Sequence, residues 1–377
     1  MCKGIVKQHV DHPEKVSYLE EQILTYLGNK RMLLNEIGIQ LDFICHDLGK
    51  TKLVSLDLFS GSGIVARYLK QYSSCVYAND LEMYSRIINE CYLSNESDFD
   101  RDLYLKYLRK ILSQIKKHPI HGIIRNNYSP KDDSSITSCD RVFYTNENAV
   151  FIDSVRYYVD LLVPEYYRNY FLARLLIESS VHVNTAGIFK GFYKDRNTGI
   201  GKFGGSGENA LVRIKGKIDM SPPILSNYHT DFEVFQKDAN DLAKVLKDID
   251  VAYLDPPYNQ HPYGSNYFML NIIAANKINA PVSDVSGIPS DWNRSNFNKK
   301  QVALLSLEDV VSSLDAKYLI VSYNNEGFIS FADMKNMLTK YGVLKTVANE
   351  YNTFRGSRNL NNRSLKTVEY LFVLKKS

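Results

Sequence analysis

The sequence predicts an α/β protein with a doubly wound parallel sheet, and two consecutive strand–helix units carry that prediction. Residues 52–63 alternate apolar and polar side chains, stop at glycines and continue into helical spacing over residues 64–72. Residues 74–80 form a second short apolar run that ends on an acid, and residues 81–93 resume helical spacing. This succession of strand, helix, strand and helix begins a sheet whose parallel strands are joined by helices.

A polar and basic block interrupts this pattern in the middle of the chain. The α/β pattern returns after the block in four segments, which are residues 231–246, 248–258, 316–327 and 367–376. We therefore predict that residues 1–92 and 231–377 form one α/β domain, which is split by an inserted domain of residues 93–230.

The composition is that of an ordinary globular protein, with 44% hydrophobic and 23% charged residues among 377. The chain has no apolar run of about 18 residues, and its first residues lack the apolar segment of a secretory signal, so we expect no membrane span. Five scattered cysteines without a C-x-x-C spacing favour reduced thiols and a cytoplasmic location. The eight histidines show no ligand spacing, so we expect no metal site.

Basic residues are concentrated in two stretches, although the net charge is only +4. Residues 101–131 contain eight basic residues and one acid, and residues 190–217 contain seven basic residues and two acids. Tyrosines and phenylalanines are interleaved with both. Clustered positive charge with aromatic side chains is typical of nucleic-acid binding. A solvated helix face remains an equal alternative for either stretch taken alone.

A glycine turn, Phe59-Ser60-Gly61-Ser62-Gly63, follows the first strand-like run. Glycines there let the backbone approach a ligand at the beginning of a helix. Only G-x-G is present, which favours a nucleoside ligand over a dinucleotide, and a purely structural turn is the alternative. The literal G-x-G-x-x-G of residues 199–204 follows no apolar strand and opens no helix, so we reject it as a dinucleotide site.

Asp80 closes the second strand-like run, 17 residues after Gly63. An acid at this place in a doubly wound sheet accepts hydrogen bonds from ribose hydroxyls. Asp is also a common residue at a helix N-cap, which is the alternative role. With the glycine turn upstream, we favour the ribose role.

The tetrapeptide Asp255-Pro256-Pro257-Tyr258 ends the strand-like run of residues 248–254. Each proline removes a backbone N–H and leaves a carbonyl acceptor. The result is a stiff turn that offers the Asp255 carboxylate and the Pro256 carbonyl beside the flat ring of Tyr258. Such a turn suits a planar group that bears an amino group, while an ordinary proline turn after a strand is the alternative.

The order of these motifs resembles that of a known family. The segment Thr25–Ile37 contains Y-L-G-N-K and is followed by the glycine turn, the basic block and D-P-P-Y. This order resembles the Dam-like DNA adenine methyltransferases of bacterial restriction-modification systems, which use S-adenosylmethionine. The resemblance implies a Rossmann-like methyltransferase domain formed by residues 1–92 and 231–377, with a target-recognition domain inserted at residues 93–230.

The resemblance also assigns residues to S-adenosylmethionine. Lys30 is expected to contact the methionine carboxylate, Asp80 the ribose, and Asp238 the region of the cofactor adenine. The backbone around the glycine turn is expected to line the methionine. The implied cofactor-binding residues are Tyr26, Lys30, Asp57, Phe59, Gly61, Gly63, Asp80 and Asp238.

The target adenine is expected at Asp255, Pro256, Pro257 and Tyr258. Hydrogen bonds from its amino group to Asp255 and the Pro256 carbonyl would make the nitrogen a better nucleophile, so that methyl transfer depends mainly on alignment. Because this nitrogen is unreachable inside a duplex, the base must be flipped out, and Tyr258 would stack on it.

The implied partner is double-stranded DNA, and a restriction endonuclease that acts on the same site is left open. Lys190, Lys194, Arg196 and Lys202 are expected to contact phosphates, which position the protein without reading sequence. The three arginines of residues 354–363 form either another DNA contact or an exposed loop.

Two other functions remain open from the sequence. One is a methyltransferase that acts on RNA or on a protein glutamine, since related sites carry Asn-Pro-Pro-Tyr. The other is a catalytically silent nucleic-acid-binding subunit that keeps the fold. Asp255 and the long basic block argue against the first, and the intact Gly61, Gly63 and Asp255 argue against the second.

Overall fold

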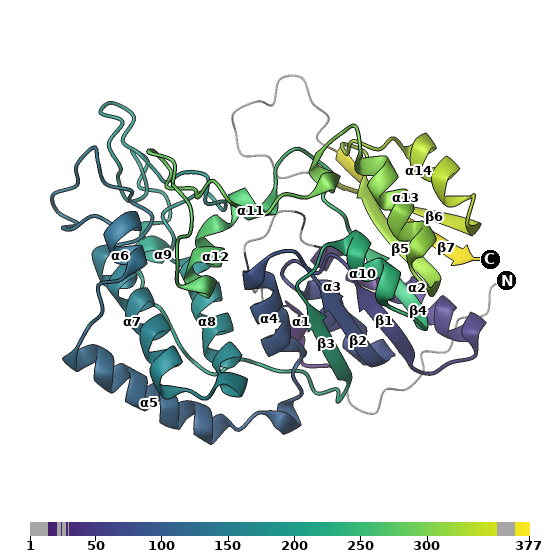
Figure 1. Ribbon diagram of the computed structural model, residues 1–377, viewed down its shortest axis with the longest axis horizontal. Coiled ribbons are helices and arrows are strands. Elements are labelled where there is room, and N and C mark those ends of the chain that lie inside the picture. The colour runs from purple at the N-terminus through teal and green to yellow at the C-terminus, as the bar shows by residue number, and fades with distance from the viewer. Residues whose placement is uncertain (1–13, 21–23, 25–27, 29, 353–365) are drawn as a thin grey trace.

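The computed structural model describes residues 14–20, 24, 28, 30–352 and 366–377. They form two lobes that lie side by side (Figure 1). An α/β lobe carries a sheet with helices on both faces, and a lobe made of helices and long loops lies against it. No helix in these ranges is long and apolar enough to cross a membrane.

Seven described strands form one sheet in the order β3-β2-β1-β4-β5-β7-β6. Strands β3, β2, β1, β4 and β5 run parallel, and β7 lies antiparallel between β5 and β6. The order reverses between β1 and β4, and in sheets of this kind ligands bind at the carboxyl ends of the strands beside such a reversal. The strands are β1 (Leu53–Asp57), β2 (Ser73–Asn79), β3 (Asp231–Phe235), β4 (Ile249–Leu254), β5 (Ala316–Asn324), β6 (Gly342–Asn352) and β7 (Lys366–Lys376).

Both faces of the sheet are covered, which confirms the predicted doubly wound α/β fold. Along β4, Val251 and Tyr253 belong to one core cluster, and Ala252 and Leu254 belong to the cluster on the opposite face. This alternation is the two-residue period of a strand, and it explains why β4 is apolar throughout. The covering helices are α2 (Leu34–Leu48) and α3 (Ile64–Leu69) on one face, and α10 (Ala239–Val245), α13 (Ala303–Ser313) and α14 (Phe331–Leu338) on the other.

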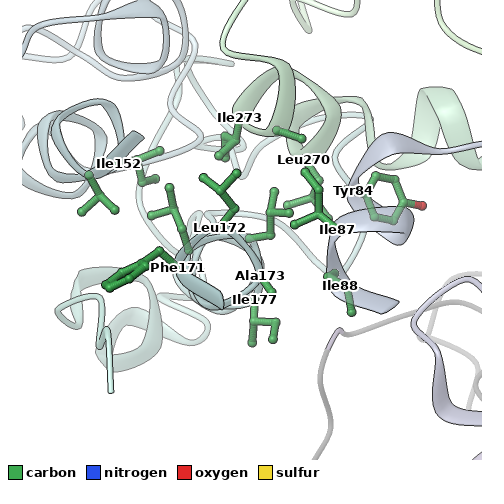
Figure 2. Packing of buried hydrophobic residues seen from close by; sticks show 14 of the residues in the cluster. Tyr84, Ile87, Ile88, Ile152, Phe171, Leu172, Ala173, Ile177, Leu270 and Ile273 are labelled. Carbon is green, nitrogen blue, oxygen red and sulfur yellow. The ribbon is translucent and has the colours of Figure 1, made fainter. Parts of the chain in front are cut away.

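The helical lobe is packed around α8 (Arg168–Val181), which Figure 2 shows end-on. Leu172 of α8 lies among Ile152, Ile273 and Ile87, which come from three other helices, α7, α12 and α4. The remaining helices are α1 (Val16–Glu20), α4 (Met83–Leu93), α5 (Arg101–Lys117), α6 (Ile123–Tyr128), α7 (Asn146–Leu162), α9 (Leu211–Lys215), α11 (Tyr263–Asn266) and α12 (Phe268–Ala275). Short 3-10 turns are η1 (Arg31–Leu33), η2 (Lys70–Tyr72), η3 (Glu96–Asp98), η4 (Glu165–Tyr167) and η5 (Asn296–Asn298).

The core of the helical lobe extends beyond residues 93–230. Helix α4 precedes this range and α12 follows it, yet both contribute buried side chains to the same cluster as α7 and α8. The chain therefore enters this lobe twice, once through the basic block and again through α11 and α12. The division into domains stays a prediction, and the packing adds α4 and α12 to the neighbours of the inserted block.

Candidate active site

A pocket lies at the carboxyl ends of β1, β2 and β4, where the strand order reverses. Its wall is formed by the turn after β1, the segment after β2, the beginning of α10, the residues after β4, and parts of residues 293–298. Gly63, Pro256 and Tyr258 are not among the residues of this wall, and Tyr26 lies outside the described residues. The predicted site residues that line the pocket are Lys30, Asp57, Phe59, Gly61, Asp80, Asp238, Asp255 and Pro257.

The glycine turn depends on its two glycines for different reasons. Gly61 lines the pocket, and its N–H donates a hydrogen bond to Asp80 Oδ2 at 2.8 Å. Gly63 precedes α3 with φ 78°, and a Cβ atom there would lie 2.4 Å from Asn89 Oδ1. Gly63 is therefore required by backbone conformation and by packing. Its contact with a cofactor stays a prediction.

Two acids follow β2, and both line the pocket. The Asp80 carboxylate accepts the N–H groups of Gly61 and Glu82 at 2.8 and 2.9 Å, so it ties the glycine turn to the end of β2. Asp80 does not cap α4, whose N-cap is Glu82. The Glu82 side chain is buried and accepts hydrogen bonds from the side-chain amides of Asn271 and Asn293. Burial, with a further effect of the Asp80 charge, raises the pKa of Glu82 to about 7.

Glu82 was not predicted from the sequence. The available signal was its position, because it is a second acid close behind the strand that Asp80 ends. An acid there is also common in the first turn of a helix, which hides its place in the pocket.

Asp57 ends β1 and is buried in the wall of the pocket. Its Oδ2 atom accepts the N–H of Ala66 at 2.9 Å, whereas Oδ1 is buried without a hydrogen-bond partner in the described part of the chain. Burial raises the pKa of Asp57 well above its usual value, and the Asp255 charge adds to this effect. A buried acceptor without a donor costs free energy, so a ligand that donated a hydrogen bond to Oδ1 would recover it.

An aromatic pair and a helix terminus complete the wall. The ring of Phe59 packs edge-to-face on Phe297, with centroids 5.1 Å apart and an interplanar angle of 81°. Asp238 is the N-cap of α10, and its side chain accepts the N–H of Asn240 at 2.8 Å. Phe297 lies in η5, far along the chain from every motif, and sequence reasoning missed it.

Asp255 directly follows β4 and forms an ion pair with Lys30, with 3.1 Å between Oδ1 and Nζ. The same Nζ atom lies 2.8 Å from Glu369 Oε1 of β7, and both Lys30 and Glu369 are buried. Burial alone would lower the pKa of Lys30, but Asp255 and Glu369 outweigh it and the pKa is raised well above its usual value. Burial raises the pKa of Asp255 against the opposing charge of Lys30, and Glu369 adds to the rise.

This cluster changes the expectation for Lys30. Its nearest anions are two carboxylates of the protein, so its predicted contact with a methionine carboxylate stays a prediction. Glu369 was not predicted, although a single acid within the apolar run of β7 was a visible signal. Acids are rarely buried in a strand unless they are paired.

The two prolines and Tyr258 form a fixed edge of the site. Pro256 is buried and Pro257 lines the pocket. The carbonyl of Tyr258 accepts the N–H of Phe328 at 3.0 Å, and its ring packs edge-on against Tyr323 with 6.3 Å between centroids. Tyr258 is therefore held by both its backbone and its ring, beside the ion pair of Asp255.

The predicted DNA contacts lie in a hairpin-like loop between α8 and α9. Lys194 and Gly201 pair as an antiparallel bridge. Buried Asn184 anchors the loop, because its side chain accepts the N–H of Gly204 at 2.9 Å and donates to the carbonyl of Val142 at 2.8 Å. Of the four predicted phosphate-binding cations, three are exposed, namely Lys190, Lys194 and Arg196. The fourth, Lys202, is half-buried.

The two basic stretches lie at different ends of the helical lobe. Figure 1 shows the loops that join α8 and α9 at the top of the lobe and α5, which carries most of the first stretch, at the bottom. The rejected glycine motif of residues 199–204 is the second half of the hairpin, and it connects no strand to a helix. The arginines of residues 354–363 lie outside the described residues.

The family of the chain follows from its similarity to known proteins. Residues 26–337 match the model of the D12 class N6 adenine-specific DNA methyltransferases. The chain belongs to this family.

Its relatives agree with this assignment. The D12 chain is 30% identical to the Type II methyltransferase M.NlaIII of Neisseria lactamica, over 94% of this chain and 100% of that protein. It is 28% identical to the Type II methyltransferase M.CviAII of Paramecium bursaria Chlorella virus 1, over 92% and 97% of the two chains. It is 28% identical to the Modification methylase StsI of Streptococcus sanguinis, but spans only 47% of that protein.

The predicted activity is therefore confirmed, and this D12 class chain is an adenine-specific DNA methyltransferase. A substrate other than DNA is not favoured. The narrower Dam-like subgroup and the role of each site residue stay predictions. In the described ranges, no group of three or more His, Cys, Asp or Glu side chains is arranged to hold a metal ion.

Proposed function

We propose that this D12 class enzyme transfers a methyl group from S-adenosylmethionine to the N6 atom of an adenine flipped out of double-stranded DNA. One observation carries the proposal. Asp255, the acceptor at the end of β4, lines the same pocket as Asp57 of β1 and as Phe59 and Gly61 of the glycine turn. An amino group bonded to Asp255 and a donor held by the turn would therefore meet in one cavity.

The pocket fits S-adenosylmethionine in its chemistry. Asp57 Oδ1 is a buried acceptor without a donor in the described part of the chain, which suits the methionine ammonium group. Asp80 and Glu82 offer carboxylates for ribose hydroxyls, and the Phe59–Phe297 pair offers an apolar surface for the adenine ring, near Asp238. When bound, S-adenosylmethionine supplies an electrophilic methyl group on its sulfonium.

The residues of D-P-P-Y would act on the target base. Asp255 and the Pro256 carbonyl accept the two amino hydrogens, and Pro257 places no competing N–H there. The carboxylate also stabilises the positive charge that grows on the amino nitrogen. Its raised pKa makes Asp255 an effective acceptor for the proton that the methylated nitrogen releases. Tyr258 is already held beside this position and supplies a ring for stacking.

We also propose how the enzyme contacts DNA, which enzyme accompanies it and where it works. Lys190, Lys194, Arg196 and Lys202 would contact DNA phosphates from the hairpin. The relatives are named Type II methyltransferases or modification methylases, so we place the enzyme in a restriction-modification system with an endonuclease that acts on the same DNA sequence. We expect it to work in the cytoplasm, where its DNA substrate lies.

Transfer of a labelled methyl group tests the proposal. The enzyme is incubated with radiolabelled S-adenosylmethionine and unmethylated bacterial DNA, which is then digested to nucleosides. We expect the label in N6-methyladenine and nowhere else. Asp255→Ala should abolish transfer and keep DNA binding, because it removes the acceptor and leaves the hairpin intact.

The control variant is Asp241→Ala, which changes an exposed acid of α10 outside the pocket and should keep full activity. Label in another nucleoside, or on RNA but not on DNA, would contradict the proposed substrate. Full activity of Asp255→Ala would contradict the proposed role of that residue.

A further inference from the structure

The ammonium group of Lys30 lies between two carboxylates that belong to different strands. Its Nζ atom is 3.1 Å from Asp255 Oδ1 and 2.8 Å from Glu369 Oε1. Ser322 of β5 donates a hydrogen bond of 2.7 Å to the same Oε1 atom. Only 6% of the Lys30 side chain and 2% of the Glu369 side chain are exposed, so water does not screen these charges strongly.

The three charged groups are not held equally firmly. Lys30 lies in a loop, where it precedes η1 without making a side-chain cap. Glu369 lies within β7, where it stands opposite Asn324 of the neighbouring strand β5 and Asn349 of the neighbouring strand β6. A residue in the interior of a sheet is fixed by its ladder, so Glu369 is the rigid partner and Lys30 the positioned one.

We propose that Glu369 is a positioning residue for methyl transfer, which holds Lys30 against Oδ1 of Asp255 and so orients that carboxylate toward the target amino group. The inference rests on the proposed role of Asp255. With Lys30 on one oxygen, the other oxygen is presented to the adenine. A long lysine side chain without a second anchor would occupy several rotamers, and the orientation of the carboxylate would vary with it.

Glu369 also sets the charge of the cluster. Two carboxylates around one ammonium group leave a net negative charge beside the nitrogen on which positive charge develops. Without Glu369, the pair of Lys30 and Asp255 would be neutral. In the described part of the chain, the titratable groups that also interact electrostatically with Asp255 include Asp57, Tyr253, Tyr258 and Tyr263.

The substitution Glu369→Gln tests the inference. It keeps the size of the side chain and removes its charge. We expect kcat to fall between about 10- and 100-fold, the range of a small misalignment in an active site, while KM for DNA and the Kd of S-adenosylmethionine change less than about twofold. Since the charge of Glu369 opposes ionisation of Asp255, its removal should shift the acid limb of the kcat–pH profile to lower pH.

Further variants separate positioning from a purely structural role. Glu369→Asp keeps the charge on a shorter side chain, so it should restore the acid limb while kcat stays reduced. Lys30→Gln should lose activity, and adding Glu369→Gln to it should cost little more, because both act through the same contact. Glu233→Gln, on the exposed part of β3, is the matched control and should behave as the wild type.

Wild-type kcat and an unmoved acid limb in Glu369→Gln would overturn the inference. If that variant fails to fold, Glu369→Asp and Ser322→Ala carry the test, and wild-type kcat in both would overturn it equally. An inactive Asp255→Ala beside a fully active Glu369→Gln would reject this inference alone. An active Asp255→Ala would instead reject the proposed role of Asp255, on which the inference rests.

Discussion

At the scale of single residues, the pocket contains a carboxyl group whose burial costs free energy of folding, and a ligand that bound it would offset that cost. Asp57 is one, because its Oδ1 atom is buried without a donor in the described part of the chain and its pKa is raised by burial. A carboxyl group whose pKa is higher in the folded state than in the unfolded state weakens folding as it ionises. Its destabilising effect is absent below the unfolded pKa and grows as pH rises toward the folded pKa.

Asp57→Asn should therefore stabilise the free enzyme at pH 8 more than at pH 4. The amide can still accept the N–H of Ala66, but it carries no charge to bury. The same change should weaken the binding of S-adenosylmethionine, because it removes the acceptor that we propose for the ammonium group of the cofactor. Thermal unfolding across this pH range and calorimetric titration measure the two effects, and equal stabilisation at both pH values would contradict the argument.

Gly63→Ala should destabilise the protein more than Gly49→Ala does. Both glycines have positive φ, 78° and 62°, so alanine at either site costs about 1 kcal/mol from the backbone. At Gly49 a Cβ atom meets nothing within 4 Å, whereas at Gly63 it lies 2.4 Å from Asn89 Oδ1. We therefore expect Gly63→Ala to lower the free energy of unfolding by about 1–3 kcal/mol more than Gly49→Ala does, because of that overlap. Urea unfolding of the two variants gives the difference.

The residues of the site differed in how well the sequence revealed them. Asp80 and Asp255 stand beside short motifs whose chemistry is local, and the structure places both in the pocket. Glu82, Phe297 and Glu369 carry no motif. Their place in the site arises only when distant segments come together, as when β7 inserts between β5 and β6 and brings Glu369 to Lys30.

At the scale of elements, the strands with apolar runs were predictable and one of the two edge strands, β6, was not. Strand β6 was not among the predicted strands, because its sequence, GVLKTVANEYN, mixes polar and apolar residues without a strong alternation. It lies at the edge of the sheet and pairs only with β7 among the described strands, so less of it needs to be apolar. Of the hairpin between α8 and α9, only the basic character was predicted, and its antiparallel bridge was not.

Removing cations from this hairpin should weaken DNA binding. Lys194→Ala with Arg196→Ala removes two exposed cations, and we expect the slope of log Kd against log salt to fall by roughly one for each phosphate that the protein no longer neutralises. The control pair is Lys106→Ala with Lys110→Ala on α5, at the opposite end of the lobe. Fluorescence anisotropy with a short duplex measures both pairs. A stronger weakening by the α5 pair would contradict the placement of DNA on the hairpin.

At the scale of the whole molecule, an inserted block was predicted from the sequence, and the packing of its helices against α4 and α12 was not. A change in composition marks where the basic block begins and ends. It does not show that Leu270 and Ile273, which follow D-P-P-Y, are buried in the same cluster as Phe171 of the block. Contacts between residues so far apart in the chain leave no local pattern.

A fragment of residues 93–230 should not form a cooperative fold by itself. It lacks α4 and α12, so the apolar face of α8 seen in Figure 2 would be exposed to water. We expect helical far-ultraviolet circular dichroism with a broad thermal transition and binding of a hydrophobic dye. A fragment of residues 81–302 contains both helices and is the control. A sharp transition in the shorter fragment would contradict this expectation.

The second entry of the chain into the helical lobe bears on the prediction that this lobe recognises the target sequence. An exchange of residues 93–230 with a relative would leave α12 of the old protein in the core of the new one. Asn271 of α12 also holds Glu82 in the pocket, so the graft would disturb the wall of the pocket as well. If this lobe recognises the target sequence, as the resemblance predicts, it is inherited together with the flank of the D-P-P-Y motif, and altering specificity would require transplanting both stretches at once.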